Sequence, residues 1–306
     1  MPREAKISAL VLIILCGLGG LCSDVFFTSA NLVNILTASA TIGILSIGAS
    51  FVLAAKKLDL SIGSFMALTA IFGATFGHSG TGIIGLTLLC GVVTGLINGV
   101  MVGFLKLPSF IVTLAMLGLA RGVALVISDG DPIYDLSPSV IYIGQGEIFG
   151  VPVPVILFAL LAALCGLILN YTKFGIQTLC IGDNENACAR AGIKITRHNM
   201  ILFSLSALLS AVAGLIYMGR VNAADPAAGA GYELLAITAA IIGGTSIFGG
   251  KTSIFGTVCG ALILSVIQNC LTLLNISAYY QEILIGLILI FAISLEKVKI
   301  YPRGMR

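Results

Sequence analysis

The sequence predicts an all-α, polytopic membrane protein, with about ten transmembrane helices in a single domain over residues 1–306. Three observations predict this class. Of the 306 residues, 58% are hydrophobic and 9% are charged, whereas a soluble domain carries about a quarter charged residues. Apolar blocks follow one another through the whole chain, many of them near the 20 residues or so that cross a bilayer. Lysine and arginine lie almost entirely at alternate ends of these blocks.

Long apolar blocks with almost no charged residues define the expected spans. They cover residues 7–23, 25–55, 60–105, 107–128, 148–172, 198–219, 234–250, 252–281 and 283–295. Block 60–105 is too long for one helix and breaks at the turn-forming residues 78–82, which makes ten spans in all. Residues 1–23 have the charge pattern of a signal peptide but no A-x-A-like cleavage site, so we expect the first span there. Residues 23–36 predict either an interfacial helix or the beginning of the second span.

Charge placement predicts the orientation of the spans. If the first span enters from the cytoplasm, ten spans leave both termini cytoplasmic, and most basic residues lie inside. These are Arg3, Lys6, Lys56, Lys57, Lys106, Lys173, Arg190, Lys194, Arg197, Lys251, Lys297, Lys299, Arg303 and Arg306. Arg121 and Arg220 are the exceptions. The longest outer loop, residues 129–151, is acidic, and the longest inner loop is residues 171–199.

The inner loop contains a candidate docking helix of about two turns. Asp183 is a plausible N-cap, because its carboxylate can accept the free amides of a first helical turn. Gly192 is a plausible C-terminal stop, because glycine adopts left-handed backbone without steric cost. Ala187 and Ala191 lie four residues apart, and such small residues admit close approach. We therefore expect this helix to dock on a separate cytoplasmic subunit.

A weak internal repeat appears at an offset of 169 residues. It pairs residues 67–70 with 236–239, and residues 90–91 with 259–260. Chance could produce these matches, since alanine and glycine are abundant. The offset nevertheless superposes the third span on the eighth, as two inverted five-helix repeats would.

Polar residues close to the third span suggest an inner gate. Asp59 is expected to cap that span at the inner surface, where an acid suits a helix N-terminus. With Ser61 and Ser64, and with Gly63 loosening the helix, it would also line a water-filled path, since polar groups at membrane depth must be buried or hydrated.

Four further residues within spans are candidates for the path. Arg121 lies near the middle of a span, where it either binds helix-end carbonyls, the alternative that we favour, or lines the path. Asn98, like Asn269, is more easily explained by interhelical hydrogen bonds than by ligand contact. Phe110 and Thr113 follow Pro108 and offer an aromatic face and a hydroxyl to a neutral polyol.

Several function classes are disfavoured by what the sequence lacks. It contains no HExxH, GxSxG or Walker phosphate-binding motif, so we expect no catalytic residues and no ATP hydrolysis by this chain. Two isolated histidines and eight scattered cysteines predict no metal site. Basic residues are not interleaved with aromatic ones, which argues against nucleic acid. A self-sufficient facilitator or ion-coupled carrier stays open as the alternative to a driven permease.

Four blocks carry a family resemblance. LDLSIGS (58–64), GLINGVMVGFLKLPSFIVTLAMLGLARGVAL (95–125), GDNENACARAGIK (182–194) and GYELLAITAAIIGGTSIFGGKTSIFGTVCGALILSVIQN (231–269) together resemble the ribose-type sugar ABC transporter permeases. The family's coupling motif corresponds to residues 184–192, beginning at Asn184, with Glu185, Ala187 and Gly192 at its characteristic places. Charge pairing between Glu185 or Arg190 and the ATPase would orient the docking. The family's Asp-Leu-Ser motif corresponds to residues 59–61.

The resemblance implies a multi-pass subunit of the bacterial inner membrane that imports a monosaccharide or similar small polyol. It also implies the partners: an ABC ATPase subunit that uses ATP and Mg²⁺, an extracytoplasmic sugar-binding protein, a second permease copy or paralogue, and the lipid bilayer. No cofactor is expected on this chain. The sequence departs from the family at residues 55–57, Ala-Lys-Lys instead of a Thr-Gly-Gly-like turn, and at Lys251-Thr252 instead of Arg-Gly.

Overall fold

The computed structural model describes residues 3–300. The chain ends, which we predicted to be cytoplasmic, lie outside the described residues with Arg303 and Arg306, as do the side chains of Arg3, Lys297 and Lys299. The described part forms twelve helices and one short hairpin. They are α1 (Arg3–Cys22), α2 (Ser29–Ala54), α3 (Ile62–Phe76), α4 (Gly80–Gly103), α5 (Ser109–Ser128), α6 (Pro138–Gln145), β1 (Glu147–Ile148), β2 (Val151–Pro152), α7 (Val153–Tyr171), α8 (Lys173–Arg190), α9 (Ile195–Val221), α10 (Tyr232–Ile242), α11 (Ile254–Leu273) and α12 (Ala278–Ile300).

Seven of these helices are long and apolar enough to cross a membrane: α1, α2, α4, α5, α7, α9 and α11. Three shorter apolar helices, α3, α10 and residues Tyr279–Ser294 of α12, occupy the remaining predicted spans. The predicted helical membrane protein is therefore confirmed, while the count of ten crossings stays a prediction.

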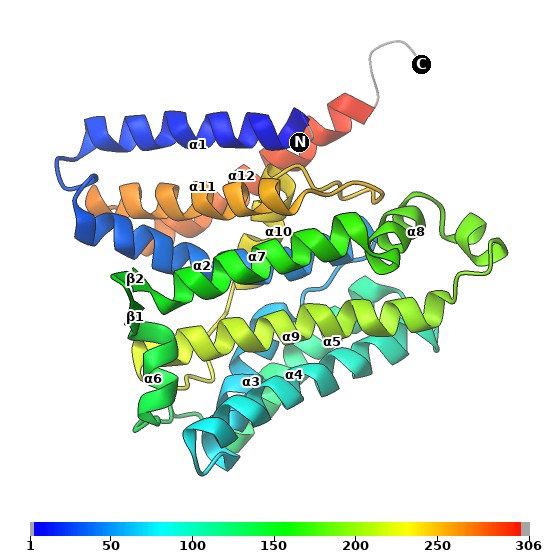
Figure 1. The fold of residues 1–306 in the computed structure, drawn as a ribbon, viewed down its shortest axis with the longest axis horizontal. Coiled ribbons are helices and arrows are strands. Elements are labelled where there is room, and N and C mark those ends of the chain that lie inside the picture. Colours follow the sequence, from blue (N-terminus) through cyan, green and yellow to red (C-terminus); the bar gives the residue numbers. More distant parts are fainter. Residues whose placement is uncertain (1–2, 301–306) are drawn as a thin grey trace.

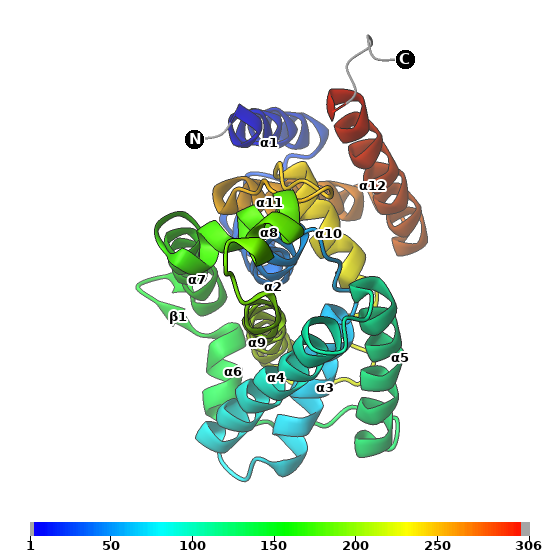
Figure 2. The ribbon, with the colours of Figure 1, turned by 90° about the vertical axis from the view of Figure 1, so that its right-hand side faces the viewer.

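The long helices lie side by side, so that the connections gather at two opposite ends (Figure 1). One end carries α8, and the other carries α6 and the β1–β2 hairpin. Seen from the α8 end, α2 and α9 lie near the middle of the bundle, with α1, α5, α7 and α12 around them (Figure 2). Most of α2 is accordingly buried from Ser39 to Ala54.

Side-chain caps decide where several helices begin. The hydroxyl groups of Thr28, Ser79, Thr172 and Ser253 each accept the backbone N–H three residues further on, at 3.1–3.4 Å. Each bond satisfies a first-turn amide that has no partner within its helix. Because Thr28 caps α2, residues from Ser29 onward belong to this helix, which is the second of the two alternatives for segment 23–36.

Helix packing relies on small residues and paired amides. A Cβ on Gly95 would lie 2.5 Å from the carbonyl oxygen of Phe203, so glycine at this position allows the backbones of α4 and α9 to approach closely. Asn31 of α2 and Asn269 of α11 exchange amide hydrogen bonds of 3.0 and 2.7 Å. This confirms the interhelical bond expected for Asn269.

The loop 129–151 is more ordered than the sequence suggested. It contains α6, which packs on α9, and Gln145 donates to the carbonyls of Gly219 and Arg220 at 3.2 and 3.1 Å. A backbone bridge pairs Ile133 with Ala224. The hairpin pairs Glu147 with Pro152, and Phe149 at its tip is fully exposed. Helix α6 escaped the prediction because eight residues are too few for a periodic pattern.

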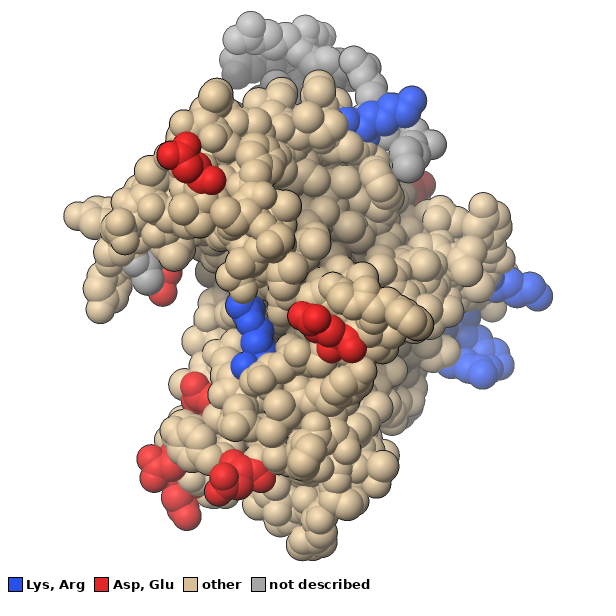
Figure 3. All heavy atoms as spheres, turned by 60° about the vertical axis from the view of Figure 1, so that its left-hand side comes forward, with Lys and Arg blue, Asp and Glu red and all other residues tan. Residues whose placement is uncertain are grey.

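Charged residues are unevenly spread over the surface. Figure 3 brings the end that carries α6 towards the viewer. Acidic side chains dominate this face, and most of the visible basic side chains lie at the right-hand edge. The predicted segregation of charge is therefore present in the folded chain.

Candidate functional site

The segment between α2 and α3 holds a buried carboxylate. Asp59 is 2% exposed. Its Oδ1 accepts the Ser61 backbone N–H at 3.0 Å and the Ser61 hydroxyl at 2.5 Å. Its Oδ2 accepts the hydroxyl of Ser206, from α9, at 3.0 Å. Burial raises the pKa of Asp59, and the hydrogen bonds from Ser61 and Ser206 oppose that rise.

The predicted capping role of Asp59 is wrong. The N-cap residue of α3 is Ser61, two positions later. The carboxylate of Asp59 is drawn into the bundle instead, because Ser61 and Ser206 supply three donors there. It therefore lies inside the protein and not at the inner surface.

Asn98 brings a residue of α4 into this cluster. Its Nδ2 donates to the Ser61 hydroxyl at 2.9 Å, which is the interhelical bond expected for this residue. Its Oδ1 is buried without a hydrogen-bond partner among the described residues. The hydroxyl of Ser64 is fully buried and donates to the Ser61 carbonyl at 3.0 Å. Asp59, Ser61, Ser64, Asn98 and Ser206 are called the polar cluster below.

Gly63 has a packing role in the described chain. It lies within the continuous helix α3, so it does not loosen that helix as predicted. A Cβ at this position would collide with the carbonyl oxygen of Gly229 and with a carboxylate oxygen of Glu233. The missing side chain lets the segment before α10 lie directly on α3.

Arg121 clamps the same segment from the side of α5. Its Nη1 donates to the carbonyl of Pro226 and, at 2.7 Å, to that of Ala228. Both carbonyls belong to the connection between α9 and α10. This geometry corresponds to the structural alternative for Arg121, with loop carbonyls in place of helix-end ones.

Thr113 and Phe110 lie differently from one another. The Thr113 side chain is fully buried, and its hydroxyl donates to Ser109 at 2.9 Å and reaches the Leu58 carbonyl at 3.3 Å. It therefore joins α5 to the segment before α3. Phe110 is 49% exposed on α5. The structure does not bring these two side chains together with Arg121 in one open pocket.

The candidate docking helix begins at a kink within α8. Asn184 has non-helical backbone angles, φ −153° and ψ 93°, and its Oδ1 accepts the Ala187 N–H at 2.9 Å. Asn184 is therefore the N-cap, and the prediction of Asp183 is wrong by one residue. The kink itself decides this, because the helix restarts only after the backbone has turned at Asn184.

The end of this helix is as predicted. Gly192 has φ +85°, its N–H donates to Ala189, and the N–H of Ile193 donates to Cys188, both at 3.1 Å. This pair of bonds is a Schellman motif. All seven predicted coupling residues are exposed around the resulting knob at the α8 end: Asp183, Asn184, Glu185, Ala187, Arg190, Ala191 and Gly192. Residues 184–192 are called the coupling helix below.

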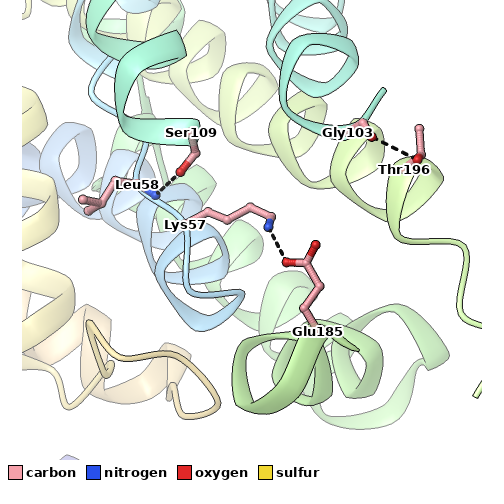
Figure 4. A network of polar contacts seen from close by, with 6 residues as sticks. All are labelled: Lys57, Leu58, Gly103, Ser109, Glu185 and Thr196. Atoms are coloured by element: carbon pink, nitrogen blue, oxygen red, sulfur yellow. Dashed lines mark hydrogen bonds and ion pairs between the residues drawn. The ribbon is translucent and has the colours of Figure 1, made fainter. Parts of the chain in front are cut away.

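One ion pair joins the coupling helix to the segment that carries Asp59. The Nζ of Lys57 lies 2.9 Å from the Oε2 of Glu185, with the Lys57 side chain 10% exposed and that of Glu185 48% exposed (Figure 4). The Leu58 N–H donates to the Ser109 hydroxyl at 3.2 Å beside it. In the sequence, Lys57 stands out only as an inner-side charge and as part of the departure at residues 55–57, and nothing singles out Ser206. Glu185 and Asp59, their partners, lie 128 and 147 positions away.

The comparisons with known proteins agree with this architecture. The family model described as "Branched-chain amino acid transport system / permease component" matches residues 31–293. The ribose import permease protein RbsC of Haemophilus influenzae is 38% identical over 94% of this chain and 91% of its own length. The L-arabinose transport system permease protein AraH of Escherichia coli K12 is 38% identical, over 90% of this chain and 84% of its own.

The chain belongs to the family of ABC transporter permeases that this model describes and that includes the ribose permeases.

Two further matches have narrower meaning. The D-allose transport system permease protein AlsC of Escherichia coli K12 is 33% identical, over 93% of this chain and 89% of its own length. A solved structure described as an inward-facing conformation of a metal-chelate type ABC transporter has a TM-score of 0.51 at 16% identity, covering 98% of the permease and 99% of that chain. At that identity it supports the fold alone. Both the coupling helix and the polar cluster lie within the part of the permease that the family model covers.

Proposed function

We propose that this permease imports a monosaccharide or a similar small polyol across a bacterial inner membrane by ATP-driven alternating access. The observation that carries the proposal is the coupling helix, an exposed knob with defined caps at one end of the bundle. Relatives named for ribose, allose and arabinose, each matching at least 90% of the chain, support the substrate class.

The mechanism needs three partners. A sugar-binding protein delivers substrate at the end that carries α6 and the hairpin, and an ABC ATPase subunit hydrolyses ATP at the end that carries α8. Two permease subunits, copies or paralogues, form the path between them. Closure of the ATPase pair displaces the coupling helices, and the bundle then opens inward. Asp59, Ser61, Gly63, Ser64, Asn98, Phe110, Thr113 and Arg121 are the proposed gate and path residues.

An inverted repeat of five helices would suit this mechanism, since many transporters switch by moving one repeat against the other. At the offset of 169 residues, the beginning of α5, Ser109, corresponds to the beginning of α12, Ala278. The beginning of α3, Ile62, corresponds within one residue to that of α10, Tyr232. The packing supports the same pairing, with α4 on α9 and α11 on α2.

Reconstitution tests the function directly. The permease is placed in liposomes alone, with the ATPase subunit, and with the ATPase and the binding protein, and uptake of radiolabelled D-ribose, L-arabinose and D-allose is measured. Concentrative uptake only in the complete system, dependent on ATP, is the expected result. Uptake by the permease alone, with or without an ion gradient, would instead identify a facilitator or an ion-coupled carrier.

A further inference from the structure

Side chains from four different helices contact the segment Ala55–Ser61. Glu185 of the coupling helix pairs with Lys57 at 2.9 Å, and Ser109 of α5 accepts from Leu58 at 3.2 Å. Ser206 of α9 and Asn98 of α4 reach Asp59 and Ser61 through the polar cluster. We call residues 55–61 the hub segment.

The residue that directly precedes the hub segment, Ala54, is also tied to the loop before α11. The carbonyl of Ala54 accepts the Gly250 N–H at 2.9 Å, and a Cβ on Gly182 of α8 would collide with the same carbonyl. The backbone of α8 thus lies directly on the end of α2. A displacement of α8 cannot leave the hub segment in place.

We propose that Lys57 is a positioning residue, which through its ion pair with Glu185 transmits movement of the coupling helix to the hub segment and to the polar cluster. This role rests on the proposed function. It is carried by position: Lys57 lies two residues before the buried Asp59, and Glu185 is the first residue after the kink at Asn184. The pair therefore joins the kink in α8 to the non-helical segment between α2 and α3.

The surroundings make Lys57 a better transmitter than an exposed lysine. Its side chain is 10% exposed and is therefore held against the protein along most of its length. Ion pairs between fully exposed side chains contribute little, because water screens the charges and both side chains are mobile. Lys56, the neighbouring cation, is exposed and lines a hollow with residues 181–186, but among the described residues it forms no ion pair with them.

The pair is consistent with the departure from the family pattern that the sequence shows at residues 55–57. A Thr-Gly-Gly-like turn carries no charge for Glu185, whereas this chain places a lysine there. When the ATPase docks on the coupling helix, it would meet the Glu185 carboxylate already paired with Lys57.

A double-mutant cycle tests this role. Lys57→Gln, Glu185→Gln and the double variant remove the charges and keep a polar side chain, and Lys56→Gln is the matched control. In the purified permease, amide hydrogen exchange at residues 185–191 is expected to rise about fivefold in each single variant, a factor that corresponds to about 1 kcal/mol. The double variant is expected to exchange no faster than either single one, because both changes remove the same interaction. Lys56→Gln should leave exchange unchanged.

The complete transporter supplies the functional readout. In liposomes with the ATPase and binding protein, the ratio of D-ribose transported to ATP hydrolysed should fall about fivefold in both single variants and no further in the double one. Independent, additive effects of the two changes, or exchange equal to wild type, would overturn the role of Lys57. Failure of the wild-type complex to transport any sugar would instead contradict the proposed function, while the exchange results would stand.

Discussion

The charge of Arg121 within a span is accommodated by hydrogen bonds to one neighbouring loop. A guanidinium at the centre of a helix costs about 3 kcal/mol on insertion scales unless it is paired. Here the carbonyls of Pro226 and Ala228, freed by the irregular connection before α10, accept its hydrogen bonds. The arginine and the non-helical segment therefore stabilise each other.

Replacing Arg121 with glutamine should lower the free energy of unfolding by about 1–3 kcal/mol, because buried carbonyls lose their donor. Thermal unfolding in detergent measures this effect. Arg220→Gln is the matched control, since Arg220 is exposed, and it should stay within about 0.5 kcal/mol of wild type. Equal melting temperatures for all three proteins would show that the hydrogen bonds of Arg121 do not contribute to the stability of the fold.

Asp59 should make stability depend on pH. Its pKa is raised in the folded protein, so the folded state binds the proton more tightly than the unfolded chain does. Between the unfolded and folded pKa values the free energy of unfolding therefore falls as pH rises, and it levels off above the folded pKa.

The variant Asp59→Asn removes this group and should show a smaller fall in melting temperature as pH rises from about 4. The difference between the two melting curves isolates Asp59, because the other carboxylates titrate in both proteins. If the melting temperatures of wild type and variant depend on pH in the same way, the raised pKa of Asp59 would be contradicted.

At the scale of elements, the coupling helix depends on its two ends more than on its few internal bonds. A helix of two turns is marginal by itself. Asn184 closes the first turn, and the left-handed Gly192 closes the last. The ends therefore determine whether the knob exists.

Gly192→Pro should uncouple ATP hydrolysis from sugar uptake while the bundle stays folded. Proline has no N–H for Ala189 and cannot adopt φ +85°. The ratio of sugar transported to ATP hydrolysed is measured in liposomes, and folding is checked by thermal unfolding.

Gly130 offers a matched control for this change. It also has φ +85° and donates its N–H to a helix end, the carbonyl of Leu125, but it lies in the loop 129–151 at the opposite end. Gly130→Pro should lower stability without changing the transport ratio. A normal ratio in Gly192→Pro would mean that the coupling helix does not need its C-terminal stop.

The sequence alone predicted the elements that depend on local signals. Apolar length identified the spans, and Gly192 identified the end of the coupling helix. Asp183 was misplaced by one residue because Asp and Asn are equally good N-caps, and only the backbone kink at Asn184 chooses between them. The Lys57–Glu185 pair spans 128 positions, a separation at which residue type gives no indication of contact.

At the scale of the whole molecule, orientation is open to a direct test. The two ends of the bundle carry the fully exposed Phe149 and the exposed Ala191. In a background without the eight native cysteines, Phe149→Cys should react with a membrane-impermeant maleimide in intact spheroplasts. Ala191→Cys should react only after permeabilisation, because positive charge keeps its loop inside. The reverse pattern would invert the predicted topology and with it the side on which the ATPase docks.

The amide pair between Asn31 and Asn269 has a consequence for how such a bundle can change shape. Sliding α2 along α11 by one helical turn, about 5.4 Å, would break both bonds of the pair. Tilting the two helices about that contact keeps both bonds. In the proposed alternating access, the pair would therefore favour tilting of these two helices over sliding at the N-terminal end of α2.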